Sequence, residues 1–473
     1  MKQIFQKKPI AKLMHESKQK TLARTLGALD LTMLGIGAIV GTGIFVLTGV
    51  VAAKHSGPAI ILSFAIAALA CAFAAFCYAE FASSVPVSGS VYTYTYATMG
   101  EVFAFLIGWD LMLEYLLATS AVANGWSAYF QSLLKGFGIH IPTILSSAPG
   151  TGKGGIIDLP AVLIILVMTV LLSRGVRESA RVNNIMVFIK IAVVLIFIFA
   201  GFNYVKPENW TPFMPFGLDG VMAGAATVFF AFIGFDAVST AAEEVKRPQR
   251  DLPIGIIASL IICTIIYVVV CLVMTGMVSY KELDVPEAMA YVLEVVGQDK
   301  VAGIIAIGAV IGIMAVIFAY IYATTRVFFA MSRDGLLPES FAKINKKTEA
   351  PTFTVWLTGI GSALIAGFID LKELSNLANI GALLTFAMVG VSVIILRKTH
   401  PKLQRGFMVP LVPILPIISI ACCLFLMVNL PLKTWMYFGA WLAIGVVVYF
   451  VYSKKHSHLK DDGSSQDNLE QAN

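Results

Sequence analysis

Residues 35–45 read GIGAIVGTGIF and place four glycines inside an apolar run long enough to cross a membrane. Each glycine costs about 1 kcal/mol relative to alanine in a helix interior. Backbone that leaves the helix inside a bilayer persists only where protein or a water-filled cavity satisfies its N–H and C=O groups. The stretch therefore predicts a helix interrupted near the middle of the membrane, and such an interruption indicates a binding site.

The two halves of such a helix present opposite partial charges to each other. If the first half ends near Ile39 and the second begins near Gly43, carbonyl groups face amide groups across the gap. Carbonyls attract a cationic group and amides attract an anionic group, so a ligand that carries both charges a few atoms apart fits the gap. The α-amino acid is the commonest metabolite of this kind, and we expect one as the substrate.

The composition is that of an integral membrane protein. The chain has 473 residues, of which 58% are hydrophobic and 13% charged, and its mean hydropathy is +0.83. Twelve apolar runs are long enough to cross about 30 Å of hydrocarbon. They start near Asp30, Ala59, Val102, Leu159, Val182, Leu218, Leu252, Ala302, Thr352, Ser375, Met408 and Lys433. The sequence thus predicts an all-α polytopic protein with twelve transmembrane helices and no soluble domain.

The distribution of Lys and Arg predicts the orientation. With the N-terminus inside, the cytoplasmic segments hold 24 basic residues and the external loops hold 8. This asymmetry follows the positive-inside rule and predicts a multi-pass protein of the cell membrane with both termini in the cytoplasm. It also accounts for the net charge of +6, so no nucleic acid partner is needed to explain that charge. No cleavable signal peptide is evident.

Cysteines and histidines argue against an intramembrane enzyme. All six cysteines lie in apolar runs, where they pack as small hydrophobic residues, and all six histidines lie outside those runs. The sequence contains no HExxH motif. Spacing identifies no pair of nucleophile and base either. We therefore expect no catalytic residues, no metal ion and no cofactor.

Three charged residues lie deep in apolar runs. Asp110 and Glu114 are four residues apart and share one helix face, where they either face a water-filled path or carry protons. A structural role, such as capping a neighbouring broken helix, is the alternative. Lys190 lies eight residues into the fifth run, about 12 Å from its cytoplasmic end. It is a candidate proton-coupling group if it stays buried, and the alternative is that its side chain snorkels to the interface.

A second interruption is predicted in the sixth run. Residues 229–237 read FFAFIGFDA and place Gly234 and Asp236 near mid-membrane. Interrupted helices in the first and sixth runs indicate two inverted five-helix repeats. The expected segments are a cytoplasmic N-terminal segment, the first repeat, the second repeat, two peripheral helices and a disordered cytoplasmic tail, at residues 1–26, 27–203, 204–397, 398–453 and 454–473. The peripheral helices serve packing or oligomer contacts in this interpretation.

With these residues in view, the chain resembles the amino acid/polyamine/organocation (APC) transporter superfamily. Within it the resemblance is to bacterial relatives of the cationic amino acid transporters. It extends over nearly the whole chain and is carried by GIGAIVGTGIF, by Lys190, by FFAFIGFDAVSTAAEEVKRPQRDLP at residues 229–253, and by SRDGLLP at residues 332–338. It implies a permease that works by alternating access.

The resemblance also implies roles for particular residues. Amides around Thr42 and Gly43 would bind the substrate carboxylate. Carbonyls matching Ile39, Phe230 and Ile233 would bind its amine, and Phe230 would form an aromatic lid. Lys190 matches a lysine found in proton-coupled members, and Glu114 and Asp236 resemble the acids that assist it.

Substrate choice departs from the family name. The position that Met314 matches has more room in animal relatives that carry arginine or lysine, so the resemblance implies a shorter pocket here. The resulting expectation is a proton-coupled importer of neutral L-amino acids. An amino acid exchanger, or a cationic amino acid or polyamine permease of the same fold, is the alternative. An oligomeric or small membrane-protein partner is left open.

Overall fold

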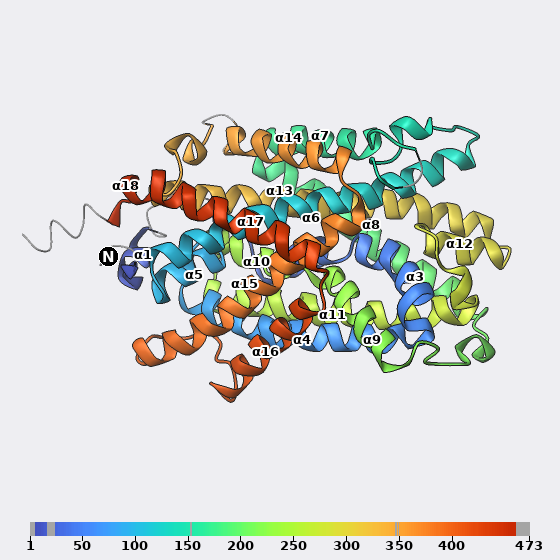
Figure 1. The fold of residues 1–473 in the computed structure, drawn as a ribbon, viewed down its shortest axis with the longest axis horizontal. Helices are drawn as coiled ribbons and strands as arrows, with labels where there is room; N and C mark the ends of the chain where they lie inside the picture. The colour runs from blue at the N-terminus through green and yellow to red at the C-terminus, as the bar shows by residue number, and fades with distance from the viewer. Residues whose placement is uncertain (1–4, 17–23, 152–153, 346–347, 349, 460–473) are drawn as a thin grey trace, which may run out of the picture.

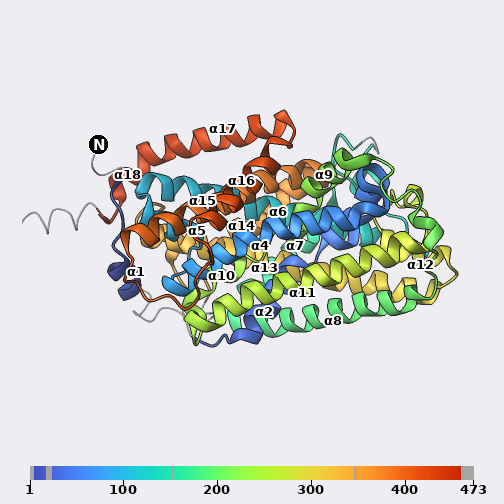
Figure 2. The ribbon, with the colours of Figure 1, turned by 90° about the horizontal axis from the view of Figure 1, so that it is seen from below.

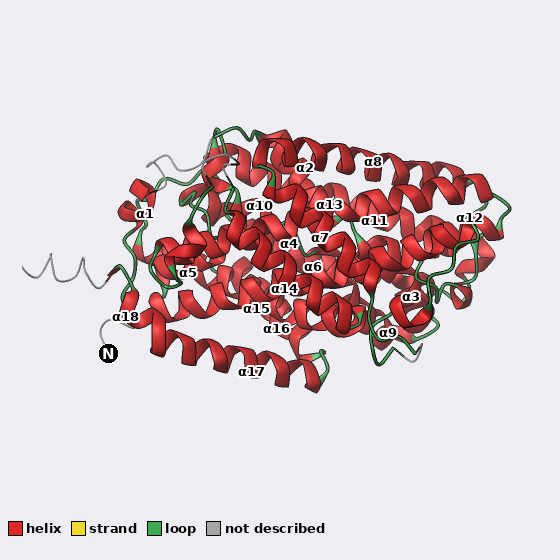
Figure 3. Ribbon diagram, turned by 90° about the horizontal axis from the view of Figure 1, so that it is seen from above, coloured by secondary structure: helices red, strands yellow, loops and turns green. Residues whose placement is uncertain are grey.

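The computed structural model describes residues 5–16, 24–151, 154–345, 348 and 350–459, and every structural statement below concerns those residues. Their regular elements are helices, joined by turns and loops (Figure 3). The helices that carry the architecture are α1 (Ile10–Glu16), α2 (Ala28–Ile39), α3 (Thr48–Val51), α4 (Ile60–Ser84), α5 (Val91–Thr98), α6 (Glu101–Gly136), α7 (Leu159–Ser173), α8 (Val176–Phe202), α9 (Gly217–Val228), α10 (Ala237–Thr240), α11 (Pro248–Met277), α12 (Ala288–Val295), α13 (Asp299–Arg333), α14 (Thr352–Phe368), α15 (Leu371–Thr399), α16 (Ile414–Val428), α17 (Leu432–Val448) and α18 (Lys454–His456).

The helices confirm a multi-pass membrane protein. In the described residues, eight helical stretches are long and apolar enough to cross a membrane, and α2, α7, α14 and α16 are shorter apolar helices. Each of the twelve predicted apolar runs contains a helix. The longer helices lie roughly along the long axis of the molecule (Figures 1 and 2). The central helix α6 packs against α13 and α15, and α11 packs against α4 and α2.

Several helix starts differ from the predicted starts of the apolar runs, and proline explains two of them. The seventh run was expected from near Leu252, but α11 begins at Pro248. Proline suits the first helical position, because its missing N–H has no intrahelical partner there. The eleventh run was expected from Met408, but α16 begins at Ile414, directly after Pro413. Prolines at 410 and 413 remove backbone donors that a longer helix would need.

Both ends of the described chain dock at the same end of the molecule, where α1 and α18 lie (Figures 1 and 2). Lys8 Nζ lies 2.6 Å from Asp334 Oδ1, and both side chains are buried. From the other terminus, His458 N donates to the carbonyl of Asp334 at 3.2 Å. Residues 454–459 were expected in a disordered tail, but Leu459 is buried. The rest of that tail, 460–473, lies outside the described residues.

The link between α4 and α6 covers residues 85–100. The structure has a helix there, α5, all of whose residues are buried. Just before it, Ser88 N donates to Glu243 Oε1 at 3.0 Å, and Glu243 also pairs with Arg333 of α13. The segment is therefore part of the packed end of the molecule.

The last long helix, α17, lies at the edge of the molecule (Figure 2). It is joined to α6 by two stacked indoles, Trp109 and Trp441, whose ring centroids are 4.5 Å apart. Each indole N–H donates to the other residue's carbonyl oxygen at 3.1 Å. The remaining surface of α17 is largely exposed and apolar, as expected for a helix that faces lipid.

Candidate functional site

The first interruption lies where the glycine-rich stretch predicts it. Helix α2 ends at Ile39, and Val40 leaves the helical conformation with φ −75° and ψ 96°. The chain becomes helical again at Gly43, and Ile44 and Phe45 both donate their amides to the carbonyl of Gly41. The amides that precede Ile44 are therefore those that a helix start leaves without intrahelical acceptors.

The second interruption is also present, in the sixth run. Helix α9 ends at Val228, a tight turn covers Phe229–Phe232, and helix resumes with α10. Gly234 between them has φ +129°, a conformation that L side chains rarely adopt. An added Cβ there would lie 2.8 Å from the carbonyl carbon of Ala38. This glycine therefore allows the second interruption to lie directly on the end of α2.

The segment after the first interruption and the segment before the second are equally close. A Cβ added to Gly43 would lie 2.3 Å from Cβ of Ala231 and 2.4 Å from its Cα. A Cβ added to Gly41 would lie 2.7 Å from Val316 of α13. The glycines at 41 and 43 thus allow three segments to touch at one point, which a larger residue would prevent.

Lys190 binds the carbonyl end of α2. Its ammonium donates to the carbonyls of Gly37 at 2.8 Å and Val40 at 2.7 Å, and the side chain is fully buried. A cation at the C-terminal end of a helix interacts favourably with the helix dipole. The snorkelling alternative is wrong, because the ammonium points to the helix end and not to the surface. In the described part of the chain no carboxylate forms an ion pair with it.

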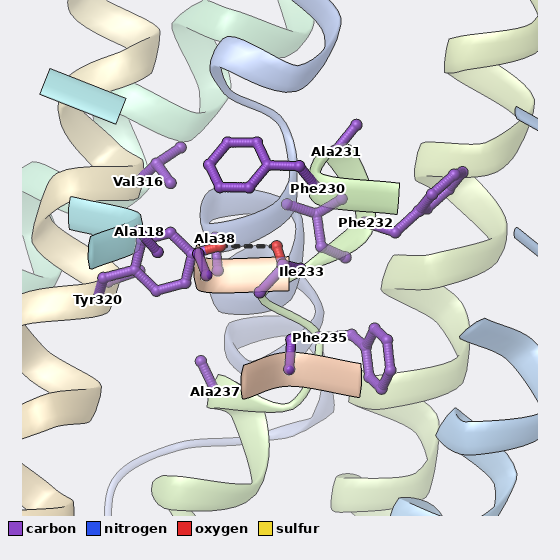
Figure 4. Close-up of a cluster of buried hydrophobic side chains, with 14 of the residues drawn as sticks. Ala38, Ala118, Phe230, Ala231, Phe232, Ile233, Phe235, Ala237, Val316 and Tyr320 are labelled. Atoms are coloured by element: carbon purple, nitrogen blue, oxygen red, sulfur yellow. Dashed lines mark hydrogen bonds between the residues drawn. The ribbon is translucent and has the colours of Figure 1, made fainter. Parts of the chain in front are cut away.

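Two tyrosines that the sequence analysis missed bind other carbonyls of the interruptions. The Tyr267 hydroxyl lies within hydrogen-bond distance of the carbonyls of Ile39, at 2.8 Å, and Ala231, at 2.9 Å. Tyr320 donates to the carbonyl of Ile233 at 2.8 Å (Figure 4). Buried tyrosine hydroxyls need partners, so a tyrosine in an apolar run was the available signal.

The expected site residues meet at these interruptions. Of the carbonyls expected to bind an amine, those of Ile39 and Ile233 accept from the tyrosines, and that of Phe230 accepts from the amide of Ile233. Each keeps a second lone pair for a ligand. On the amide side, Thr42 Oγ1 is buried without a hydrogen-bond partner. The arrangement offers acceptors on one side and donors on the other.

The expected acids lie at and beside the second interruption, and among the described residues they form no ion pair with Lys190. Asp236 accepts from the Tyr115 hydroxyl and, at 3.0 Å, from the amide of Gly234. Glu114 accepts from Thr385 of α15 at 3.3 Å and interacts electrostatically with Asp236.

Asp110 lies one helical turn from Glu114 on α6, and neither of its carboxylate oxygens has a hydrogen-bond partner among the described residues. A Cβ added to Gly381 would lie 2.8 Å from Asp110 Oδ1, so α15 closes over these acids. Among the described residues, no three His, Cys, Asp or Glu side chains form a group suited to a metal ion.

Met314 does not share the helix face that contacts the interruption. On α13 that face is formed by Gly312, which lies against Lys190, and by Val316, which lies against Gly41. Met314 is two residues from each of them, about 200° from Gly312 around the helix. Val316 and Phe230 instead point into the same cluster (Figure 4).

A cavity of about 650 Å³ opens beside the N-terminal end of α2. We name it the Arg326 cavity. Its polar lining consists mainly of Thr25, Asp30, Asn183, Asn184, Glu244, Tyr322 and Arg326. An added Cβ on Gly37, whose carbonyl binds Lys190, would lie 3.7 Å from Asn183. One residue of the cavity lining, Asn183, thus lies next to the part of α2 whose carbonyl binds Lys190.

The segments before α2 and after α10 are joined next to this cavity. Leu26 and Val245 form a short parallel bridge. The amides of Thr25 and Leu26 donate to the carbonyl of Glu244, and Lys246 N donates to the carbonyl of Leu26 at 2.9 Å. The start of α2 and the segment after α10 are therefore held by backbone hydrogen bonds.

Comparison with known proteins gives consistent results. A family model described as amino acid permease matches residues 26–452. The chain is 58% identical to a methylthioribose transporter of Bacillus subtilis, over 97% of this chain and 100% of that protein. It is 56% identical to a branched-chain amino acid permease of the same organism, over 96% and 99% of the two chains. A vacuolar cationic amino acid transporter of Arabidopsis thaliana is 38% identical, over 85% of this chain and 64% of its own length.

Proposed function

Because this chain belongs to the amino acid permease family of the APC superfamily, and is thus a multi-pass membrane transporter of small molecules rather than an enzyme, we propose that it imports neutral L-amino acids together with protons. The mechanism in this proposal is alternating access. The observation that carries it is the meeting of two broken helices, with Lys190 bound to the carbonyl end of the first.

The substrate would lie between the two interruptions. Its carboxylate would accept from the amides near Thr42 and Gly43, with the unpartnered Thr42 hydroxyl as an additional donor. Its ammonium group would donate to the carbonyls of Ile39, Phe230 and Ile233. The bonds from Tyr267 and Tyr320 to two of those carbonyls would be shared with the substrate or replaced by it.

Substrate side chains would contact apolar residues. Phe230, Val316 and Ala118 belong to the cluster at the interruption (Figure 4). An arginine or lysine side chain would be desolvated among these groups without a paired carboxylate, which is costly. The neutral class of substrate is therefore favoured, in agreement with a relative described as a branched-chain amino acid permease.

Lys190 would couple the proton to the cycle. Its ammonium binds the end of α2 only through backbone carbonyls, so loss of its proton would remove a cation from that helix end. Movement of α2 when the substrate enters or leaves would change the same two hydrogen bonds. Glu114 and Asp236 assist in this proposal, with water as the carrier between them and Lys190.

The remaining architecture is part of the same proposal. The four short apolar helices would cross the membrane with the eight longer stretches, giving twelve transmembrane helices. Residues 27–203 and 204–397 would form the inverted repeats, each beginning with a broken helix. The docked terminal segments would face the cytoplasm of a cell whose plasma membrane holds the protein, so the Arg326 cavity would open inward.

A second candidate substrate is methylthioribose, because the relative that is 58% identical is described as its transporter. The uncharged sugar would not use the separation of carbonyls and amides across the interruptions. An exchanger, or a cationic amino acid or polyamine permease, would share the fold.

The test is uptake into proteoliposomes. We expect labelled L-leucine to accumulate when the exterior is made acidic, with neutral amino acids competing and with arginine, putrescine and methylthioribose competing weakly. Sodium should have no effect. Competition by methylthioribose alone would favour the second candidate. Uptake that needs internal amino acid but no pH gradient would show an exchanger.

A further inference from the structure

We propose that the Arg326 cavity is a second binding site for a zwitterionic amino acid, distinct from the space between the two interruptions. The inference rests on the proposed function, because it names the transported amino acid as the occupant. At about 650 Å³, the cavity has the size of ordinary small-molecule sites. Its polar lining comes from α2, α8, α13 and the segments before α2 and after α10, while α7 and the start of α14 complete its walls.

The first wall can bind a carboxylate. Arg326 is only 3% exposed, and its guanidinium lies 4.3 Å from the ring centroid of Tyr322. Its Nε donates to Glu244 Oε1 at 3.0 Å. Nη2 forms an ion pair with the same oxygen at 3.0 Å, but among the described residues it makes no hydrogen bond. Glu244 thus fixes the plane of the guanidinium, and the donors that remain suit a carboxylate.

A second wall, formed by Asn183 and Asp30, can bind an ammonium group. Asn183 Oδ1 is buried without a hydrogen-bond partner, and the residue is 3% exposed. Asp30 Oδ2 accepts from the amide of Gly27 at 2.9 Å, while Oδ1 accepts no hydrogen bond from the described residues. An amide oxygen and a carboxylate oxygen are both acceptors, and both belong to side chains that line the cavity.

The charges select the class of ligand. Asp30 and Glu244 carry two negative charges and Arg326 one positive charge, so the lining is negative overall. A simple anion such as inorganic phosphate is therefore disfavoured. A molecule that brings both an ammonium and a carboxylate group satisfies both walls. An amino acid that leaves the interruptions past Lys190 would reach this cavity directly, because Asn183 lies next to Gly37.

The first experiment counts binding sites with labelled L-leucine on the purified full-length protein. We expect two sites per chain in the wild type. Arg326→Lys keeps the charge opposite Glu244 but loses the planar fork, and Asp30→Asn keeps a capping oxygen but loses the charge. Each should weaken one site by roughly tenfold or more and leave the other unchanged. Arg333→Lys is the matched control, because Arg333 lies on the same helix and pairs with Glu243 outside the cavity lining.

The outcomes separate this inference from the proposed function. A single site in the wild type, or two sites unchanged in Arg326→Lys and Asp30→Asn, overturns the second site and leaves the transporter proposal standing. No leucine binding in the wild type overturns both.

A second measurement does not depend on counting. Asn184 is exposed and lines the cavity, so Asn184→Cys should react with a water-soluble maleimide. L-Leucine should slow this labelling, and it should still do so when Gly43→Val blocks the space between the interruptions. Protection that disappears with Gly43→Val, or that inorganic phosphate gives and leucine does not, contradicts the proposal.

Discussion

Lys190 is a buried cation whose partners in the described structure are backbone carbonyls of α2. A charged ammonium without a carboxylate partner is costly in a membrane interior, so its presence there argues for a role that needs the charge to change. The end of the broken helix is the element that such a change would move.

The first prediction concerns this lysine. Lys190→Ala should lose leucine accumulation driven by an acidic exterior and retain exchange of internal for external leucine, because the substrate groups at the interruption are backbone groups. Proteoliposome uptake and counterflow measure the two activities. Lys433→Ala is the control, since Lys433 forms an exposed ion pair with Glu373. Gradient-driven accumulation by Lys190→Ala would remove the lysine from the coupling mechanism.

The second prediction concerns Gly43. Gly43→Val should abolish leucine binding between the interruptions, because its Cβ would lie 2.3 Å from that of Ala231. Gly439→Val is the matched control, because a Cβ at Gly439 meets no atom within 4 Å. Saturation binding on folded, monodisperse protein is the measurement. Unchanged affinity between the interruptions would show that the carboxylate binds elsewhere.

The third prediction concerns Tyr267. Tyr267→Phe leaves the buried carbonyls of Ile39 and Ala231 without a shared donor, which costs about 1–3 kcal/mol. We expect a lower Tm, and a change in the KM for leucine larger than in Tyr291→Phe, whose hydroxyl is on α12. A variant as stable as wild type with the same KM would show that the hydroxyl holds neither segment in place.

The ends of the first broken helix could be predicted from sequence, because glycines at 41 and 43 are poor helix formers in an apolar run. Lys190 could be found because a charge in such a run is rare. Tyr267 and Tyr320 could not be assigned, since their partners are carbonyls far away in the chain. The Arg326 cavity could not be foreseen either, because its lining comes from several separate segments.

At the scale of elements, the rotation of α13 decides which side chain limits the substrate. The sequence places Met314 at the depth of the interruption, and a resemblance fixes that depth to within a residue or two. Residues two apart in sequence lie on nearly opposite faces of a helix, however. The α13 residue that contacts Gly41 is therefore Val316 and not Met314.

The fourth prediction compares these two residues. Val316→Ala should admit larger neutral side chains, with phenylalanine and methionine gaining affinity relative to alanine, because the removed methyl groups lie against the interruption. Met314→Ser tests the original expectation through arginine binding. If Met314→Ser gains arginine binding and Val316→Ala leaves specificity unchanged, Met314 and not Val316 limits the pocket.

The segments just before α2 and just after α10 form another unit at this scale. Three backbone hydrogen bonds join residues 25 and 26 to residues 244 and 246, just outside α2 and α10. Backbone bonds do not depend on side-chain identity, so no residue type at these positions indicates the link. In an alternating-access cycle this connection would make the two segments move together.

At the scale of the whole molecule, segments from both termini meet on Asp334. Burial alone would raise the pKa of this carboxyl group. The charges of Lys8 and Arg333, with hydrogen bonds from Lys8 and Tyr92, nevertheless hold the pKa of Asp334 below its ordinary value. A group whose pKa is lowered on folding stabilises the folded state above the unfolded pKa, and this contribution is lost as the pH falls through the folded pKa.

The fifth prediction follows from the lowered pKa of Asp334. Lys8→Met should destabilise the protein by about 3 kcal/mol at pH 7, because it leaves a buried carboxylate without its cation. As the pH falls through the lowered pKa of Asp334, the carboxyl group becomes protonated and the Tm difference from wild type should shrink. Lys7→Met is the control, since Lys7 is exposed. A Tm difference independent of pH would mean that Lys8 contributes through packing alone.

The stacked indoles of Trp109 and Trp441 also give the molecule an intrinsic optical reporter. Aromatic chromophores 4.5 Å apart, with planes inclined by 16°, couple their electronic transitions. Their spectrum therefore differs from that of two isolated indoles. Circular dichroism in the ultraviolet would show an exciton signal that disappears in Trp441→Phe. Because the pair joins α17 to α6, the signal would follow the seating of the last long helix in detergent or lipid without any attached label.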